Sequence, residues 1–423
     1  MLESCILIMI LYVVSGIINE KFKIPSTITL IVFAIIENVF QHNFMIITGK
    51  GFDEMLLLTL PLFIAYDSLH LTFDELKDNF RSLMFTACIS VIISVFIVVL
   101  IGEVMLPEYN ISAAGLVLLG CMVLATDPIT VSSIFSNFKL PHKLKILAEG
   151  EGLFNDAFVL IMFFFALNLI GGAEFSAISL ATFSFKMIVL STILGIVVAY
   201  CFMSITKRTK NIYIATIMFL LPAYISFAIA EHFHIAGILA VISSVITSRV
   251  LFERGHKVIF KLDAVKQRSF ILENEPHILS KIKFLTEIAG VFLFFSIGKL
   301  INIDMMMKYW SEILVVFCAT TLIRVLMVSK FTWISNKTIK MNDIPFHWWK
   351  VISLSGVKGG LSILMVHLIP DNYEHKELFE AIVLGNIILS TFVYALLLTI
   401  FIRKDKDKFE FEYLAEKECK NGV

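Results

Sequence analysis

Thirteen long apolar runs dominate this chain of 423 residues. An apolar run of about 17 to 25 residues is long enough for an α-helix to cross the hydrocarbon core of a bilayer. The chain is 58% hydrophobic and its mean hydropathy is +0.87, far from a soluble average. The predicted spans are centred near residues 12, 33, 62, 94, 125, 158, 192, 221, 243, 290, 322, 358 and 388. We therefore expect an all-α polytopic membrane protein, since helices satisfy their own backbone hydrogen bonds in lipid.

The placement of charge orients the chain. Lys plus Arg and Asp plus Glu both total 35, so the net charge indicates no nucleic-acid partner. Alternate connections hold most basic residues: Lys21 and Lys23, Lys77 and Arg81, Lys139, Lys143 and Lys145, Lys207, Arg208 and Lys210, the 249–283 connection, Lys337 and Lys340, and the tail from Arg403. The positive-inside rule places these connections in the cytoplasm. We predict a multi-pass protein of the plasma or inner membrane. Its N-terminus would lie outside, and residues 403–423 would form a short cytoplasmic tail.

The spans divide into two groups of six around a linking span near residue 192. The linking span reverses the insertion of the second group, which predicts two six-helix inverted repeats. The fifth span of each group, 112–137 and 346–369, carries helix-breaking residues. Pro128 removes a backbone donor from the first, and three glycines flank Lys358 in the second. Broken helices at matched positions are typical of transport sites.

Three ionisable residues lie near the middle of these spans. Asp127, Asp156 and Lys358 are each within a few residues of a span centre, or about 5 Å at 1.5 Å per residue. A charged group at this depth is costly, which indicates a function. A carboxylate removed from water holds a proton more tightly, and hard cations such as Na⁺ prefer oxygen ligands. One carboxylate can therefore bind a proton or a cation in turn.

The motifs around the aspartates resemble those of a known transporter family. ATDPITVSSIF, a short basic loop and EGEGLFND are similar to the monovalent cation/proton antiporter branch of the cation/proton antiporter superfamily, which carries Asn-Asp in place of Asp-Asp. The resemblance continues through LPLFIAYDSLHLTFDELKDNFRSL, HIAGILAVISS, FLFFSIG and SGVKGGLS. It implies a secondary active antiporter that exchanges Na⁺ or Li⁺ for H⁺, built as an elevator-like homodimer.

The resemblance also implies a division of the transmembrane domain, residues 1–402. A core that carries the ion would comprise roughly residues 82–170 and 309–402. Scaffold and dimerisation helices would comprise roughly residues 1–71 and 211–303.

The same resemblance assigns the ion and proton site. Asp156 would bind a proton or the cation alternately, and Asp127 and Thr126 would join it as Na⁺ ligands. Asn155 cannot titrate and would tie the unwound segment through its amide. Each loaded form is then neutral at Asp156, so we expect electroneutral exchange.

Glu151 and Lys358 are expected, again by resemblance, to form a structural ion pair. Glu151 lies one helical turn before Asn155, on the same helix face. The family usually has arginine where this chain has Lys358, and lysine there is more like the electrogenic branch. Lysine also lacks the bidentate fork of arginine. Gly152 stands where a serine is common, four residues before Asp156, so one candidate oxygen ligand is missing.

Two further polar residues are accessory candidates. Asp67 is either a displaced carboxylate of the site or a solvated residue at a helix end. Arg324 lies in the middle of its span and is expected to tether a carbonyl or a carboxylate.

Other functions are alternatives to Na⁺/H⁺ exchange. A K⁺/H⁺ antiporter of the same fold would differ in cavity size and ligand count, which the sequence does not fix. A non-transporting cation sensor would need a signalling domain, and a channel would conduct far faster than a carrier. Paired aspartates can perform acid/base chemistry in a membrane hydrolase, but broken helices favour translocation. We expect no enzymatic activity and no cofactor, with Na⁺ or Li⁺ and H⁺ as cargo.

Overall fold

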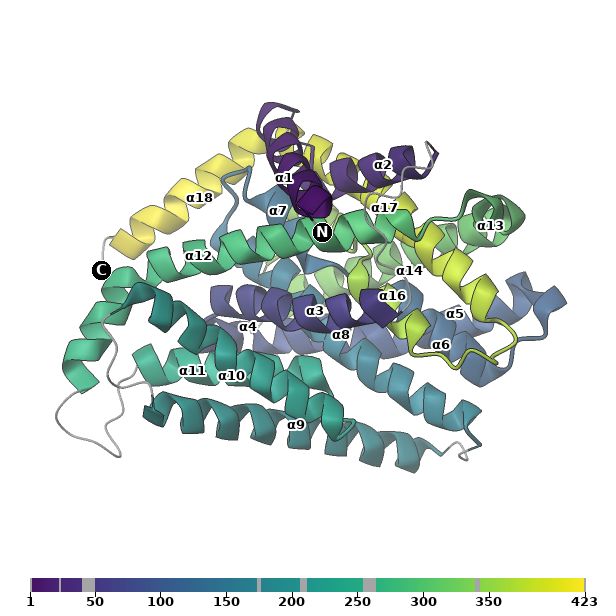
Figure 1. The fold of residues 1–423 in the computed structure, drawn as a ribbon, viewed down its shortest axis with the longest axis horizontal. Coiled ribbons are helices and arrows are strands. Elements are labelled where there is room, and N and C mark those ends of the chain that lie inside the picture. Colours follow the sequence, from purple (N-terminus) through teal and green to yellow (C-terminus); the bar gives the residue numbers. More distant parts are fainter. Residues whose placement is uncertain are drawn as a thin grey trace. The chain divides into compact units, whose positions relative to one another are not determined.

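The computed structural model of the protein describes residues 2–22, 24–39, 50–172, 176–205, 211–253, 264–338 and 343–421. These segments are helical and contain no β-strand (Figure 1). The predicted all-α class is therefore confirmed. Part of the basic connections lies outside the described residues, namely Lys23, Lys207, Arg208, Lys210, Arg254, Lys257, Lys261 and Lys340.

The predicted spans correspond to the helices of the structure. Each predicted centre falls on a helix or on one of two helix breaks. The first group consists of α1 (Leu2–Phe22), α2 (Ser26–Val39), α3 (Lys50–His70), α4 (Phe73–Met84) continued by η1 (Phe85–Ile89) and α5 (Ser90–Met105), α6 (Ala113–Leu124), α7 (Pro128–Phe135) and α8 (His142–Ile170). The linking helix is α9 (Ala177–Ile205). The second group consists of α10 (Ile212–His232), α11 (Gly237–Glu253), α12 (Ala264–Lys299), α14 (Trp310–Lys337), α15 (Phe346–Leu354), α16 (Gly360–His367) and α17 (Lys376–Lys404).

Three short elements complete the described chain: η2 (Pro107–Tyr109), α13 (Ile303–Lys308) and α18 (Lys406–Asn421). Six helical segments of the described residues are long and apolar enough to cross a bilayer by themselves: Phe73–Met105, His142–Ile170, Ile178–Phe202, Ile212–His232, Trp310–Lys337 and Lys376–Lys404. The broken helices α6/α7 and α15/α16 each stand fifth in their group, as predicted.

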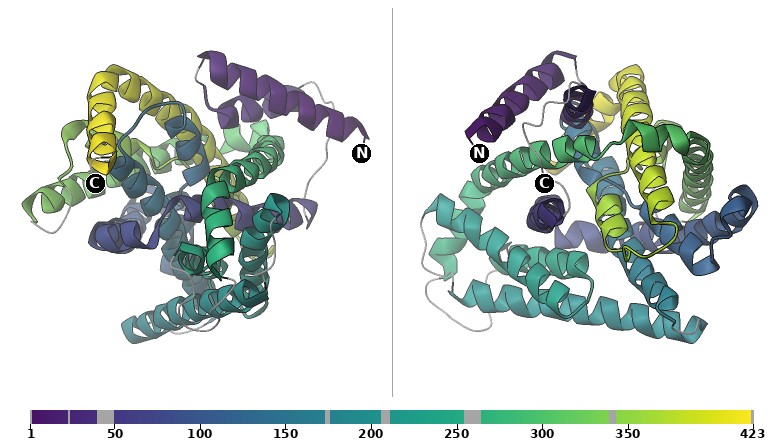
Figure 2. Two further views of the ribbon diagram at one scale, coloured as in Figure 1. Left: turned by 90° about the vertical axis from the view of Figure 1, so that its left-hand side faces the viewer. Right: turned by 45° about the vertical axis from the view of Figure 1, so that its right-hand side comes forward.

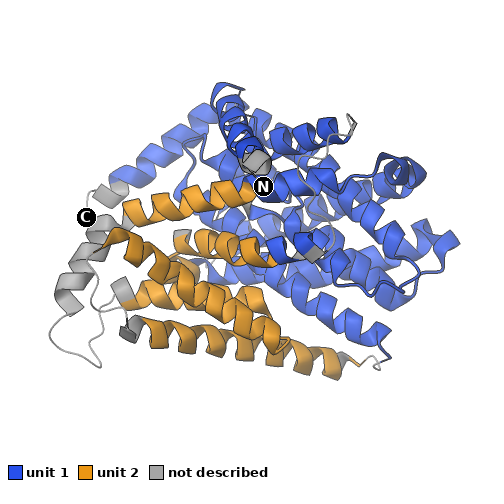
Figure 3. Ribbon diagram, viewed as in Figure 1, with its two compact units in different colours: residues 1–56, 79–173, 291–423 blue, residues 57–78, 174–290 orange. Residues whose placement is uncertain are grey.

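The chain forms two compact units (Figure 3). Unit 1 comprises residues 1–56, 79–173 and 291–423, and unit 2 comprises residues 57–78 and 174–290. Both predicted core segments fall within unit 1, whereas the predicted scaffold segments are divided between the units. The assignment of a moving core and a fixed scaffold stays a prediction.

In unit 2, α9 packs closely against α11, with α10 beside both (Figure 2). Gly195 permits this approach, because a Cβ atom there would lie 2.3 Å from the carbonyl oxygen of Ala240. Small residues at such crossings are typical of helix packing in membranes.

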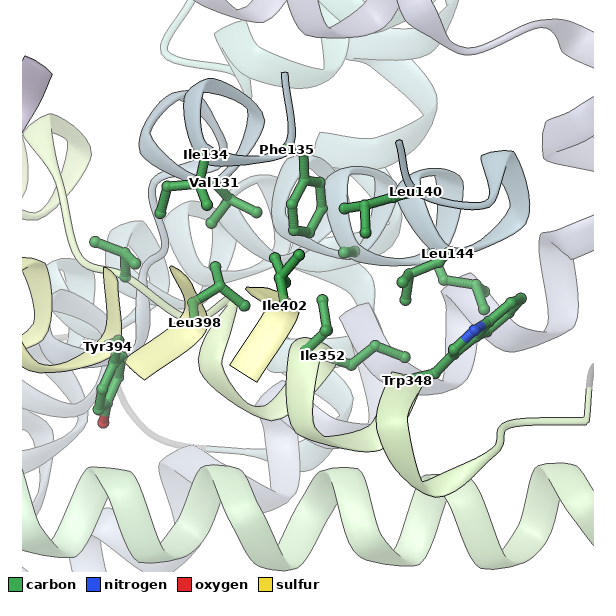
Figure 4. Packing of buried hydrophobic residues seen from close by; sticks show 14 of the residues in the cluster. Val131, Ile134, Phe135, Leu140, Leu144, Trp348, Ile352, Tyr394, Leu398 and Ile402 are labelled. Carbon is green, nitrogen blue, oxygen red and sulfur yellow. The ribbon is translucent and has the colours of Figure 1, made fainter. Parts of the chain in front are cut away.

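In unit 1, an apolar cluster holds the ends of both broken helices (Figure 4). It combines residues of α7, the start of α8, α15 and α17: Val131, Ile134, Phe135, Leu144, Trp348, Ile352, Tyr394, Leu398 and Ile402. The segments that flank the two breaks therefore share one core.

The tail forms an ordered helix, α18, which returns from the end of α17 (Figure 1). Phe409 is buried in the apolar cluster. The carboxylate of Glu412 contacts Nε2 of His347 and accepts from Nε1 of Trp348, both at 2.8 Å. Glu416 accepts a bond of 2.6 Å from the N–H of His142 at the start of α8. Helix α18 thus connects α8 to α15.

Asp405, between α17 and α18, provides a test of this connection. Its carboxylate accepts hydrogen bonds from Lys408 and Lys350, both at 3.0 Å, and these bonds lower the pKa of Asp405. Since the folded-state pKa lies below the unfolded value of about 3.9, the bonds stabilise the fold above that pH. The stabilisation is lost as the pH falls through the lowered pKa.

We expect Asp405→Asn to reduce the free energy of unfolding at pH 7 by about 1 kcal/mol, as for a partly exposed ion-pair network. The deficit should disappear in strongly acidic buffer. Thermal unfolding in detergent measures both, with exposed Asp407→Asn as the matched control. A deficit that is equal at pH 7 and in acid would contradict the assignment.

Candidate functional site

The break between α6 and α7 exposes backbone groups that side chains of α8 satisfy. Pro128 begins α7 without a donor and disfavours helical geometry in the residue before it. The carbonyl oxygen of Leu124 accepts from Nδ2 of Asn155 at 3.2 Å, and the N–H of Thr126 donates to Asp156 Oδ1 at 2.8 Å. The Asn-Asp pair therefore holds the unwound segment through its backbone.

Asp156 is anchored through one of its two oxygens. Oδ1 also accepts from the Thr126 hydroxyl at 3.2 Å, and that hydroxyl in turn accepts from Asn155 at 3.2 Å. Oδ2 takes no part in these bonds. The side chains of all three residues are buried, and Asp156 is only 8% exposed. The structure thus brings together three of the four predicted ion and proton-binding residues.

Asp127, the fourth predicted residue, occupies a different position at the same break. It directly precedes α7, and its carboxylate accepts a short hydrogen bond from the Thr130 hydroxyl. Its N–H donates to the carbonyl oxygen of Val357 at 2.6 Å. Asp127 thus joins the first break to the second, and its expected role as a Na⁺ ligand stays a prediction.

At the second break, between α15 and α16, a side chain again bonds to a freed backbone group. The N–H of Lys358 donates to Oγ of Ser390 on α17 at 3.0 Å. Gly359 lies against the first break, since a Cβ atom there would be 2.5 Å from the Cβ of Asp127. Glycine is therefore required where the two breaks cross. A larger side chain would separate them.

Glu151 has a different partner from the one expected. Both of its oxygens accept from the guanidinium of Arg324, each at 2.7 Å, and no ion pair joins it to Lys358. The planar fork of arginine matches a carboxylate bidentately, whereas lysine provides a single point charge. Arg324 also donates to the carbonyl oxygen of Ile352 at 3.0 Å and to Oγ of Ser355 at 3.2 Å. The same guanidinium therefore neutralises Glu151 and donates to a backbone carbonyl at the second break.

The Glu151–Arg324 pair is deeply buried, with side chains 5% and 15% exposed. Removing one member of such a pair leaves an uncompensated charge and typically costs about 3 to 5 kcal/mol. Lys358 is buried as well. Lys358 is thus a second buried basic residue of the site.

Asp67 belongs to unit 2, where it is buried in α3. Burial does not fit the alternative of a solvated residue at a helix end. Its accessory role in ion binding stays a prediction.

Sequence analysis did not identify Thr130, Ser355 or Ser390 as supports of the site. Thr130 had a local signal, because a hydroxyl three residues after an Asp-Pro helix start is well placed to contact the cap. Ser355 stands directly before the glycine-rich segment. Ser390 had no such signal, since its partner is 32 residues away along the chain.

Comparisons with known proteins identify the family of this chain. The family described as "Sodium/hydrogen exchanger, transmembrane" matches residues 7–404. The Na⁺/H⁺ antiporter NhaG of Bacillus atrophaeus is 27% identical over 387 residues, which cover 89% of this chain and 67% of NhaG. The Na⁺/H⁺ antiporter NhaH of Halobacillus aidingensis is 24% identical over 400 residues, or 92% of this chain and 93% of NhaH.

A solved structure shares the fold. The sodium proton antiporter MjNhaP1 of Methanocaldococcus jannaschii superimposes with a TM-score of 0.68 at 21% identity, covering 97% of this chain and 98% of that one. The match of the family over nearly the whole chain and the agreement in fold lead to one conclusion. This multi-pass membrane protein belongs to the sodium/hydrogen exchanger family.

Proposed function

We propose that this protein exchanges Na⁺ or Li⁺ for H⁺ across the plasma or inner membrane, with Asp156 as the shared binding group. The observation that carries this proposal is the position of Asp156, which is buried at a helix break and accepts two hydrogen bonds from Thr126 through Oδ1. A carboxylate that is held in this way can still offer its other oxygen to a proton or a cation. The relatives NhaG and NhaH are Na⁺/H⁺ antiporters by name, which supports the same function.

Exchange follows from competition at Asp156. The protonated carboxyl and the Na⁺-loaded carboxylate are both neutral at this residue, whereas the empty carboxylate is an anion. Moving an uncompensated charge through the hydrocarbon region is costly. The two loaded forms therefore cross, and the empty form does not. Thr126 contacts Asp156 and Asp127 follows Thr126 in the unwound segment, and we assign both as further oxygen ligands for the hard cation.

The exchange is electroneutral in this proposal. Asn155 cannot titrate, and Glu151 is already neutralised by Arg324 through two hydrogen bonds. Asp156 is then the group whose charge changes during the cycle. One proton is exchanged for one monovalent cation.

The organisation of the transporter is part of the proposal. Residues 82–170 and 309–402 form the core that carries the ion, and residues 1–71 and 211–303 form the scaffold through which two copies associate. The N-terminus lies outside and α18 lies in the cytoplasm, as the placement of basic residues indicates.

Proteoliposomes with an imposed pH gradient test the function. Wild-type protein should drive Na⁺ flux opposed to H⁺ flux, and Asp156→Asn should reduce it at least 100-fold because the shared group no longer ionises. Asp371→Asn, which changes an exposed carboxylate, is the matched control and should retain the wild-type rate. Unchanged flux in Asp156→Asn would overturn the assignment.

The same vesicles decide between cations. Na⁺, Li⁺ and K⁺ are supplied in turn, and dissipation of the pH gradient is followed with a lumenal dye. We expect a response to Na⁺ and Li⁺. A response to K⁺ alone would identify a K⁺/H⁺ antiporter, and binding without flux would identify a cation sensor.

Membrane potential tests the stoichiometry. With a potential clamped by K⁺ and valinomycin, the initial rate of Na⁺-driven H⁺ movement should stay within about 20% of its value at zero potential, since no net charge moves. Flux that follows the potential would contradict electroneutral exchange. It would instead indicate Lys358 as a proton carrier.

Gly152→Ser should strengthen cation binding. A Cβ atom at position 152 would lie 3.4 Å from Oγ1 of Thr126 and 3.6 Å from Cβ of Pro128, so the side chain fits at close contact. Its hydroxyl would add an oxygen on the face of α8 that carries Asp156. We expect the apparent Km for Na⁺ to fall by about threefold to tenfold, which is the effect of one additional contact about as strong as a net hydrogen bond.

Gly152→Ala is the control, because it adds the same Cβ atom without the oxygen. Both variants are assayed for Km at fixed pH. An equal change in both would show that packing, and not a new ligand, alters the affinity.

A further inference from the structure

Helices α8 and α15 begin in the same way. Each starts directly after a proline, Pro141 or Pro345, whose side chain makes no capping hydrogen bond to the free N–H groups of the first turn. Neither first turn contains an acidic residue, although a negative charge stabilises this end of a helix. Both helix starts therefore leave room for a carboxylate from elsewhere in the chain.

Helix α18 brings a carboxylate to each start. Oε2 of Glu416 accepts from the N–H of His142, the first residue of α8, at 2.6 Å. The carboxylate of Glu412 contacts Nε2 of His347 and accepts from Nε1 of Trp348, both at 2.8 Å and both in the first turn of α15. Residues four apart lie on the same face of a helix. One face of α18 thus holds the starts of both helices.

Apolar packing fixes α18 in this position. Phe409 is buried and belongs to the apolar cluster that also contains Leu144 of α8 and Ile352 of α15. Its ring lies 5.1 Å from the ring of His347, edge to face. Glu412 follows Phe409 by one turn. The glutamates therefore extend from a helix that is itself anchored in the core of unit 1.

The two helices that α18 holds also position the two breaks. Asp156 of α8 accepts from the N–H of Thr126 at 2.8 Å in the first break. The carbonyl oxygen of Val357, in the segment that follows α15, accepts from the N–H of Asp127 at 2.6 Å. Thr126 and Asp127 are neighbours in the chain, so one is held by α8 and the other by the end of α15. A shift of α8 relative to α15 therefore changes how these candidate ligands are arranged.

We propose that α18 is a shared cap that sets the positions of α8 and α15 along their axes, and that Glu412 and Glu416 thereby determine the affinity of the site for Na⁺. This inference rests on the proposed exchange at Asp156. A proton needs one carboxylate oxygen, whereas a hard cation is bound by several oxygens. A small shift of Thr126 relative to Asp127 therefore weakens cation binding and has little effect on proton binding. The two glutamates are positioning residues, because they act through the helices.

Glu412→Ala and Glu416→Ala test the proposal in proteoliposomes of the full chain. Misplacement of a site by a distant substitution can cost up to about 100-fold, so we expect the apparent Km for Na⁺ to rise by about threefold or more in each variant. The maximal rate at saturating Na⁺ should stay close to the wild-type rate. Glu418→Ala, which removes an exposed carboxylate from the same helix, is the matched control and should keep the wild-type Km.

A second measurement reports affinity without transport. Na⁺ is titrated into purified protein in detergent, and the protons released from Asp156 are followed at fixed pH. Both alanine variants should need more Na⁺ for half-maximal release, by the same factor as the rise in Km. The total release at saturation should equal that of the wild type, because proton binding is retained.

The double variant Glu412→Ala/Glu416→Ala tests whether the two contacts form one link. Loss of either contact already disconnects α18 from one of the two helices, so the second substitution should add little. We expect the Km of the double variant to be close to the larger of the two single effects. Independent contacts would instead multiply their effects on Km, and this result would contradict a shared cap.

The outcomes separate this inference from the proposed exchange. Absence of Na⁺-driven H⁺ flux in the wild type would overturn the exchange itself. Normal exchange in the wild type, with a wild-type Km in both single variants, would overturn the role of α18 alone. A lower maximal rate at an unchanged Km would also overturn that role, because loss of folded protein reduces the number of active copies and not their affinity.

Discussion

Two helices of this membrane protein break where the chain is buried, and every backbone group freed by a break needs a partner there. The polar side chains around the breaks meet this need. Asn155 and Asp156 satisfy the carbonyl of Leu124 and the N–H of Thr126, and residues of α14 and α17 do the same at the second break. The site is therefore a consequence of the broken backbone. The carboxylate proposed to carry the ion is also a structural acceptor.

The Glu151–Arg324 pair reduces the net charge of the site. A bidentate pair places both charges within 2.7 Å of each other, and the same guanidinium satisfies the carbonyl of Ile352. Arg324 also lies close to Gly356, where a Cβ atom would approach its Nε to 2.9 Å. The absence of a side chain at this glycine lets the guanidinium reach the backbone. Arg324 neutralises Glu151 in this way, and Asp156 remains a carboxylate outside this ion pair.

The sequence predicted the spans and both breaks because each has a local cause. Apolar length defines a span, and Pro128 or a glycine cluster interrupts it. The partner of Glu151 could not be predicted in the same way. Arg324 and Lys358 are both basic residues in apolar spans, and only the packing of α14 against α15 decides which of them reaches the carboxylate. The contact of Ser390 and the docking of α18 likewise depend on segments far apart in the sequence.

The bond from the N–H of Asp127 to the carbonyl of Val357 is made by main-chain atoms alone. The bond therefore does not depend on which side chains the two residues carry, so a substitution at either position leaves its donor and acceptor in place. Proline at position 127 is the exception, because proline alone lacks the donor. Gly359 beside this bond has no such freedom, because a Cβ atom there would lie 2.5 Å from the Cβ of Asp127. The crossing of the two half-helices is thus held by main-chain atoms and by one missing side chain.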